Sequence, residues 1–160
     1  MNISDIVSSY NLKNPRLAYV GSLGSHSALD VSCGAADEGL KSVVTCKKGR
    51  ERTYIHHLKR ERGSRTVGCI DKVILLNDLK QLADEDVQNS LRRLKTIYVP
   101  DRSFEVYLGY DVIGSKFNVP LLGNRDVLPI EERTGQYKLE KNQDYFVKLA
   151  GLLRVDRLLP

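Results

Sequence analysis

The 160-residue sequence has no apolar run long enough to cross a membrane. Such a helix needs about 20 consecutive apolar residues, and the runs here span only a handful. The N-terminus also lacks the basic region followed by an apolar stretch that marks a secretory signal. We therefore expect a cytoplasmic protein with no membrane partner.

Cysteine is scarce, with only Cys33, Cys46 and Cys69. These three are too few and too far apart for a disulfide framework or for a metal site with paired ligands. Since cysteine is a common buried small residue, we expect reduced structural thiols. With five prolines and 41% hydrophobic residues, the composition excludes the disordered and fibrous classes. A chain of this length can form one sizeable core.

Acidic residues are outnumbered, which leaves a net charge of +5, and much of the excess lies between Lys41 and Arg65. A basic surface suits anionic ligands, from a single phosphate to nucleic acid. Because acidic residues are interleaved with the basic ones, a solvated helix face explains this segment as well. Only 7% of the residues are aromatic, and so few rings to stack bases argue against nucleic acid as a partner.

Apolar, β-branched runs alternate with amphipathic segments along the first 125 residues. The runs predict strands at 17–20, 42–46, 72–76, 96–99 and 119–123. The amphipathic segments predict helices at 27–40, 51–62, 84–94 and from 103 onward. Such alternation, with short connections, predicts an α/β fold with a doubly wound, mostly parallel sheet. The last run contains a proline and is expected at an edge.

Open parallel sheets bind ligands at the carboxyl ends of their strands, and the first loop at that edge spans residues 21–27. Its glycines, its serine hydroxyls and the free amides of the following helix suit a phosphate. The Gly-x-x-Gly spacing matches neither the dinucleotide fingerprint nor the nucleoside triphosphate loop. His26 can serve as a neutral imidazole at the helix start. Alternatively, Ser25 or Ser27 caps the helix while His26 packs.

Two further loops are expected at the same edge. Residues 100–103 offer the Arg102 guanidinium for a bidentate phosphate contact and the Ser103 hydroxyl as a helix cap. Asn124 and Arg125 form a third polar group, which a plain turn explains as well. The adjacent pair His56 and His57 points its rings about 100° apart, so it is not expected to bind a metal.

At these residues the sequence resembles the archaeal formate-dependent 5-formaminoimidazole-4-carboxamide ribonucleotide synthetase family, PurP, of the ATP-grasp superfamily. The matching blocks follow the family order over most of residues 17–151. They are 24–30, 34–35, 37–39, 49–51 with Tyr54, Pro100 with 102–104 and Tyr107, 119–120, 123–125 and 131–133.

The resemblance implies a Rossmann-like, pre-ATP-grasp domain followed by an ATP-grasp region. It also implies a ligase that uses ATP and magnesium to join formate to aminoimidazole carboxamide ribonucleotide (AICAR), forming FAICAR in purine (IMP) biosynthesis. By motif, His26 and Ser103 match positions that contact AICAR. The expected substrate-binding residues are His26, Ser103, Ser25, Ser27 and Arg102, and the expected phosphate or nucleotide contacts are Gly24, Asn124 and Arg125.

The sequence also departs from that family. A full member is expected to be about twice this length and to carry its ATP site and magnesium ligands further along. We expect residues 1–125 to form the substrate-binding domain and residues 126–160 to form a linker and the start of an incomplete ATP-grasp region. Asp101 stands where a more basic or neutral residue is expected. The chain should therefore bind AICAR without turning over alone, either as a homo-oligomer or with a separate ATP-grasp chain.

Other functions remain open at this point. The same loops could serve a non-catalytic ribonucleotide sensor or regulatory subunit. The basic segment could meet a nucleic-acid backbone. An NAD-dependent dehydrogenase is a further alternative, which the missing third glycine of the dinucleotide fingerprint weakens.

Overall fold

The computed structural model describes residues 3–62, 65–123 and 125. The chain divides into two units, Met1–Arg125 and Asp126–Pro160, and all described residues belong to the first. The predictions made for Asn124 and for residues 126–160, including the linker and the start of an ATP-grasp region, lie outside the described residues.

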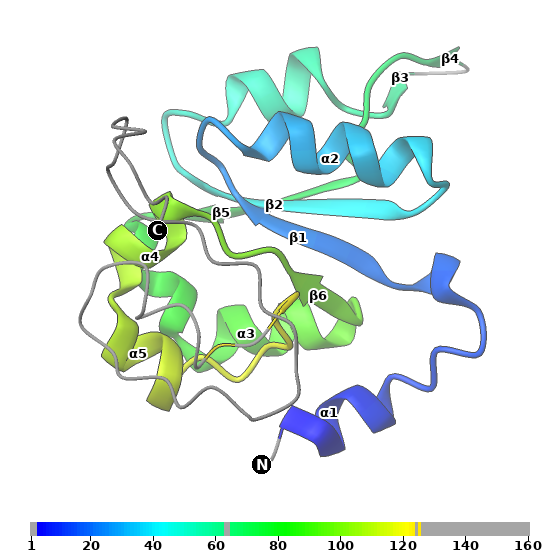
Figure 1. Ribbon diagram of the computed structural model, residues 1–160. Helices are drawn as coiled ribbons and strands as arrows, with labels where there is room; N and C mark the ends of the chain where they lie inside the picture. Colours follow the sequence, from blue (N-terminus) through cyan, green and yellow to red (C-terminus); the bar gives the residue numbers. More distant parts are fainter. Residues whose placement is uncertain (1–2, 63–64, 124, 126–160) are drawn as a thin grey trace, which may run out of the picture. The chain divides into compact units, whose positions relative to one another are not determined.

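The described part of the chain forms a four-stranded parallel sheet in the order β5-β2-β1-β6 (Figure 1). The strands are β1 (Tyr19–Leu23), β2 (Lys41–Lys47), β5 (Lys72–Leu76) and β6 (Thr96–Tyr98). An isolated parallel bridge between Tyr98 and Leu121 continues the sheet beyond β6. The chain moves outward from β1 to β2 and β5, then returns to the other side of β1. The reversal between β1 and β6 makes their carboxyl ends the topological switch point.

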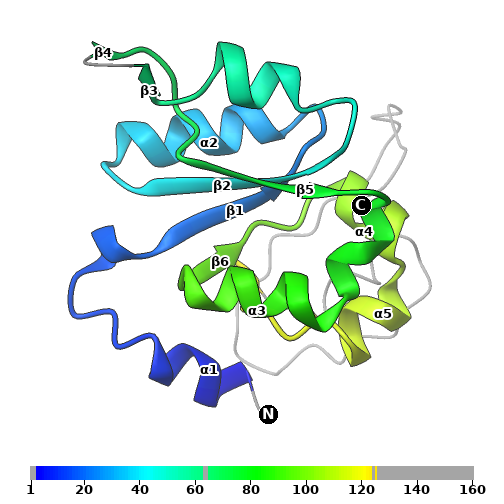
Figure 2. The same cartoon turned by 180° about the vertical axis from the view of Figure 1, so that it is seen from behind.

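Helices cover both faces of this sheet, as the two opposite views show (Figures 1 and 2). One face carries α2 (Ala28–Asp37). The other carries η3 (Leu79–Ala83), α3 (Glu85–Arg93), α4 (Arg102–Leu108) and α5 (Tyr110–Ser115). The remaining helical elements are α1 (Ile3–Ser9), η1 (Pro15–Leu17) and η2 (Thr53–His57). The predicted α/β fold with a parallel sheet is confirmed. Within the described ranges, no helix has the length and apolar character that a membrane span requires.

The first strand differs from its prediction because Gly21 was expected to begin a loop. In the structure β1 runs through Gly21 and ends at Leu23. A Cβ added to Gly21 would lie 2.6 Å from Thr96 Cγ2 and 2.7 Å from Tyr98 Cδ2. Glycine is therefore required at this position because β6 packs closely against it, and not because the chain turns there.

The predicted helix at 51–62 is largely wrong. Only one turn of π-helix forms, η2, and it is followed by the short hairpin of β3 (Glu61–Arg62) and β4 (Arg65–Thr66). The Leu58 carbonyl accepts hydrogen bonds from the backbone amides of Cys69 and Ile70. Because the Leu58 carbonyl is used by these long-range bonds, it does not accept the hydrogen bond that would continue the helix. The predicted strand at 119–123 is likewise reduced to the bridge at Leu121.

Two hydrophobic clusters hold the helices against the sheet. On the α2 side, the buried cluster consists of Ala28, Val44, Cys46, Tyr54, Cys69 and Ile70. On the other side, the rings of Tyr98, Phe104 and Phe117 lie 5.1–5.6 Å apart between centroids. Aromatic pairs at such distances each add about 0.5–1.5 kcal/mol beyond the burial of their surface. The cluster links β6 to the start of α4 and so holds one wall of the switch point in place.

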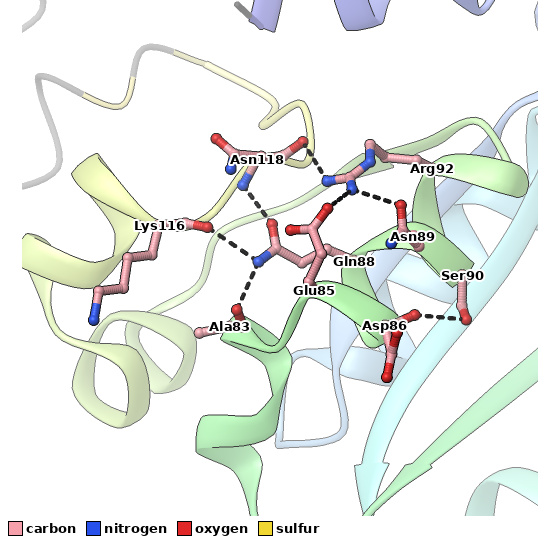
Figure 3. A network of polar contacts seen from close by, with 9 residues as sticks. All are labelled: Ala83, Glu85, Asp86, Gln88, Asn89, Ser90, Arg92, Lys116 and Asn118. Carbon is pink, nitrogen blue, oxygen red and sulfur yellow. Dashed lines mark hydrogen bonds and ion pairs between the residues drawn. The ribbon is translucent and has the colours of Figure 1, made fainter. Parts of the chain in front are cut away.

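A buried amide fixes α3 to the chain that follows α5 (Figure 3). Gln88 is 1% exposed, and its Nε2 donates to the carbonyls of Ala83 at 2.7 Å and Lys116 at 3.0 Å. Its Oε1 accepts from the backbone amide of Asn118. Nearby, Arg92 bonds the Asn118 carbonyl at 3.3 Å and also the Glu85 carboxylate. This network orients the segment that leads to the third predicted loop.

Candidate functional site

The turn after β1 and the loop after β6 meet at the switch point. The Ser25 hydroxyl donates to Asp101 Oδ2 at 2.9 Å, although the two residues are 76 positions apart in the sequence. The structure thus brings together the first two of the three predicted loops. Sequence reasoning placed both loops at this edge but did not foresee that Asp101 would join them.

The turn at 24–27 is held by backbone contacts that depend on Gly24. Its amide donates to the Thr45 carbonyl at 2.7 Å. A Cβ at this position would lie 3.1 Å from the Thr45 carbonyl oxygen, from Cys46 Cβ and from Tyr54 Cε2. Tyr54 also approaches the turn with its hydroxyl, 3.5 Å from the Ser25 carbonyl oxygen, and burial raises the pKa of this phenol. Gly24 therefore shapes the turn, while its own amide is already bonded.

The serines of this turn do not cap α2. Ser27 occupies the N-cap position without a side-chain hydrogen bond to the helix, and the Ser25 hydroxyl is directed to Asp101. His26 lies between them and is exposed. The alternative in which a serine caps the helix while His26 packs is therefore wrong. The turn presents an imidazole to solvent beside the start of a ten-residue helix, where amides carry a partial positive charge.

Ser103 was expected to cap the helix after β6, and this prediction is wrong. Asp101 is the N-cap residue, because its Oδ1 accepts from the Phe104 amide at 2.8 Å and α4 already begins at Arg102. An aspartate at this position satisfies an amide that would otherwise lack a partner within the helix. Ser103 is partly buried in the first turn of α4, and Arg102 is exposed.

Arg125 of the third loop lies against the chain around α5. Its guanidinium donates to the carbonyls of Ile113 and Phe117 at 2.9 Å each and of Val119 at 3.4 Å. These bonds tie the end of the described chain to the carboxyl end of α5. They do not test the expected phosphate contact of Arg125, which stays a prediction.

Beneath the two loops lies a buried pair of hydroxyl groups that the sequence analysis did not single out. Thr45 Oγ1 and Tyr98 Oη are 2.6 Å apart, and both residues are fully buried. Burial raises the pKa of Tyr98 far above its ordinary value, so the ring stays a neutral phenol. The pair joins β2 to β6 across β1. A threonine and a tyrosine in predicted strands carry no sequence signal for such a pairing.

A hollow lies outside the expected site residues. It has a volume of about 310 Å³ and follows the outer edge of β5, where Ile70, Lys72 and Ile74 line it. None of the predicted site residues contributes to it. Among the described residues, no group of three or more His, Cys, Asp or Glu side chains could hold a metal ion. The candidate site is therefore a surface formed by loops, and we assign it no metal ligand.

A family model described as "Protein of unknown function (DUF1246)" matches residues 20–155. Curated relatives share the name 5-formaminoimidazole-4-carboxamide-1-(beta)-D-ribofuranosyl 5'-monophosphate synthetase. The relative from Methanopyrus kandleri is 41% identical over 140 residues, covering 87% of this chain and 35% of its own length. The relative from Methanosphaera stadtmanae is 40% identical over 139 residues, covering 86% and 35%. The relative from Methanobrevibacter smithii is 32% identical over 154 residues, covering 96% and 37%.

A solved structure is also similar. It is the IMP biosynthesis protein PurP from Thermococcus kodakaraensis, which is 26% identical with a TM-score of 0.53. The match covers 71% of this chain and 32% of that one. The chain thus spans about a third of the length of the relatives it matches, so full members are longer than the factor of two expected from the sequence. The predicted resemblance to PurP is confirmed, and the chain belongs to the family described as "Protein of unknown function (DUF1246)".

Proposed function

We propose that the chain is the N-terminal, AICAR-binding part of an ATP- and formate-dependent ligase that forms FAICAR in IMP biosynthesis. The hydrogen bond between Ser25 and Asp101 is the observation that carries this proposal. It joins the turn that bears His26 to the first turn of α4, which bears Ser103. These are the two residues that the family motif assigns to AICAR, and they come from loops far apart in the sequence. The names of the curated relatives support the same substrate class.

The ribonucleotide offers a phosphate and a carboxamide to this surface. We assign the phosphate to the start of α2, where Ser27 and the first-turn amides are free of a side-chain cap. The exposed imidazole of His26 and the hydroxyl of Ser103 can each exchange a hydrogen bond with the carboxamide. Arg102 is exposed on α4 and offers a charged donor beside them, while Ser25 bonds Asp101 and holds the turn. Asn124 and Arg125 remain proposed phosphate contacts.

The chemistry of such a ligase requires more than this surface. ATP and magnesium would activate formate, and magnesium takes carboxylate and phosphate oxygens as ligands. We assign no such ligands to the described residues and propose that an ATP-grasp region outside them supplies these ligands. The domain formed by residues 3–123 would bind and orient the ribonucleotide.

Calorimetric titration of the purified chain with AICAR tests this function. We expect saturable binding that His26→Ala weakens about tenfold or more, the loss expected when a hydrogen bond worth about 1.4 kcal/mol is removed. His57→Ala is the matched control, because His57 is exposed on η2 outside the proposed contacts, and it should bind as the unsubstituted chain does. Absence of binding to the unsubstituted chain would overturn the proposal.

A ribonucleotide sensor is a second candidate, because the surface at the start of α2 and α4 can bind a ribonucleotide without carrying out a reaction. It would use the same loops without catalysis. Supplying ATP, formate, magnesium and a separate ATP-grasp chain distinguishes the two functions. Formation of FAICAR that depends on His26 supports the ligase. AICAR binding with no turnover in that mixture favours the sensor.

A further inference from the structure

Two cysteines that are distant in the sequence lie with their sulfur atoms in contact. Cys33 on α2 and Cys69 just before β5 are 36 positions apart, and their Sγ atoms are separated by 2.7 Å. Both are free thiols. A disulfide bond is about 2.05 Å long, so only a small movement separates this pair from a covalent link. We propose that Cys33 and Cys69 form an oxidisable pair that closes to an intramolecular disulfide when it meets a peroxide.

The backbone already holds both partners in place. The Cys69 amide donates to the Leu58 carbonyl at 3.0 Å, and its carbonyl accepts from the Ser42 hydroxyl at 2.7 Å. Cys33 lies within the hydrogen-bonded turns of α2. Because backbone hydrogen bonds hold both residues, the sulfur contact is part of the packing between α2 and the segment before β5. This inference does not depend on the proposed function.

The two thiols differ in their surroundings, which assigns them different parts in the reaction. Cys33 is exposed, whereas Cys69 is buried with 5% of its surface accessible. A small oxidant therefore reaches Cys33 first. Burial, together with the hydrogen bond to Cys33, raises the pKa of Cys69 to about 12, so Cys69 is a protonated thiol at neutral pH.

The steps balance with hydrogen peroxide as the oxidant. The Cys33 thiol first releases its proton to water. Its thiolate then attacks one peroxide oxygen and breaks the O–O bond, which gives a sulfenic acid and a hydroxide that takes up the released proton and leaves as water. The sulfur of Cys69 then attacks the sulfur of Cys33 and displaces the hydroxyl group, which takes the Cys69 proton and leaves as a second water. The two thiols lose two electrons in total, and the peroxide gains them.

Cys46 provides a control inside the same molecule. It belongs to the same buried cluster as Cys69, and it is completely buried. Its Sγ lies 3.4 Å from the carbonyl oxygen of Lys47, the next residue in β2. A folded chain should therefore protect Cys46 under conditions that oxidise the other pair.

The test is to treat the folded full chain with hydrogen peroxide and then count thiols after unfolding. We expect the three thiols to fall to one, with the mass of two hydrogen atoms lost and a peptide map that links Cys33 to Cys69. Dithiothreitol should restore all three thiols. The disulfide should also raise Tm, on the order of 10 °C, because it closes a long loop in the unfolded chain.

Three variants complete the test. Cys46→Ser should still lose two thiols, whereas Cys33→Ser should keep both of its remaining thiols under the same treatment. If Cys33→Ser fails to fold, Cys33→Ala serves for the same thiol count. The peptide map of the oxidised, unsubstituted chain does not depend on either variant. Disulfides between chains, sulfinic acid at Cys33 without a cross-link, or unchanged thiols would each overturn the proposal.

Discussion

Ser25 and Asp101 are joined side chain to side chain at 2.9 Å, and the same aspartate caps α4 through the Phe104 amide at 2.8 Å. One carboxylate thus serves a helix start and a neighbouring turn, with one oxygen for each. These two structural roles explain why an acidic residue, Asp101, stands at the edge of a surface that we propose binds an anion. It also makes Asp101 the residue whose loss should disturb both loops together.

Replacing Asp101 with alanine removes the cap and the contact to Ser25. We expect the free energy of unfolding to fall by about 1.5–3 kcal/mol, since a cap contributes about 1 kcal/mol and a hydrogen bond to a charged group about 1.5 kcal/mol or more. Urea denaturation followed by circular dichroism measures the change. Ser25→Ala removes only the second contact and should cost less. Equal losses in both variants would show that the cap contributes nothing.

Gly21→Ala should destabilise the chain by about 1–3 kcal/mol, because an added methyl group overpacks a filled space. The new Cβ would lie 2.6 Å from Thr96 Cγ2. Gly34→Ala is a matched control within α2, where an added Cβ meets nothing within 4 Å. Alanine should stabilise that helix by up to about 1 kcal/mol. Thermal unfolding of the two variants should therefore shift Tm in opposite directions, and a loss of stability at Gly34 would contradict this account.

Gln88→Leu should be the most damaging of these substitutions. The leucine fills similar space but leaves the carbonyls of Ala83 and Lys116 and the amide of Asn118 without their partner. Each unsatisfied buried group costs about 1–3 kcal/mol, so we expect at least 3 kcal/mol in urea denaturation. Ser90→Ala on the same helix removes an exposed hydrogen bond and should change stability by less than about 0.5 kcal/mol.

Tyr10 should contribute to a fall in stability at alkaline pH. Burial raises the pKa of Tyr10 from 10.0 to about 12. Below pH 10 the phenol is neutral in both the folded and the unfolded chain, so its contribution to the stability of the fold is fully present. Between pH 10 and 12 the unfolded chain loses the proton while the folded chain keeps it, which favours unfolding. Urea midpoints measured over this range should fall less steeply for Tyr10→Phe, and parallel curves for the two proteins would exclude the effect.

The sequence was sufficient to predict the sheet wherever neighbouring residues decide the structure. The strand predicted at 72–76 has the bounds of β5, and the helix predicted at 84–94 differs from α3 by one residue at each end. An apolar, β-branched run and an acidic first turn are local signals, and nothing distant opposes them in these segments. The parallel arrangement followed from the alternation of such segments.

Elsewhere, distant partners decided the structure. The second predicted helix stops because the Leu58 carbonyl bonds amides more than ten positions away, which no local pattern contains. Gly21 indicated a turn, yet its role depends on Thr96 and Tyr98 across the sheet. At α4 the sequence indicated Ser103 as the cap, whereas the helix begins at Arg102 and Asp101 caps it. The sequence predicted that the loops of the site lie at the same edge of the sheet, but it did not predict the Ser25–Asp101 contact.

The amide of Gln88 has a consequence for how the molecule opens. It bonds the Ala83 carbonyl before α3, and the Lys116 carbonyl and the Asn118 amide after α5. Among the described residues, these two segments share no backbone hydrogen bond with each other. One side chain thereby couples them, so local opening at either place must break bonds at the other. The Asn118 amide should then exchange its hydrogen with solvent as slowly as the core of α3, as members of one cooperative unit do.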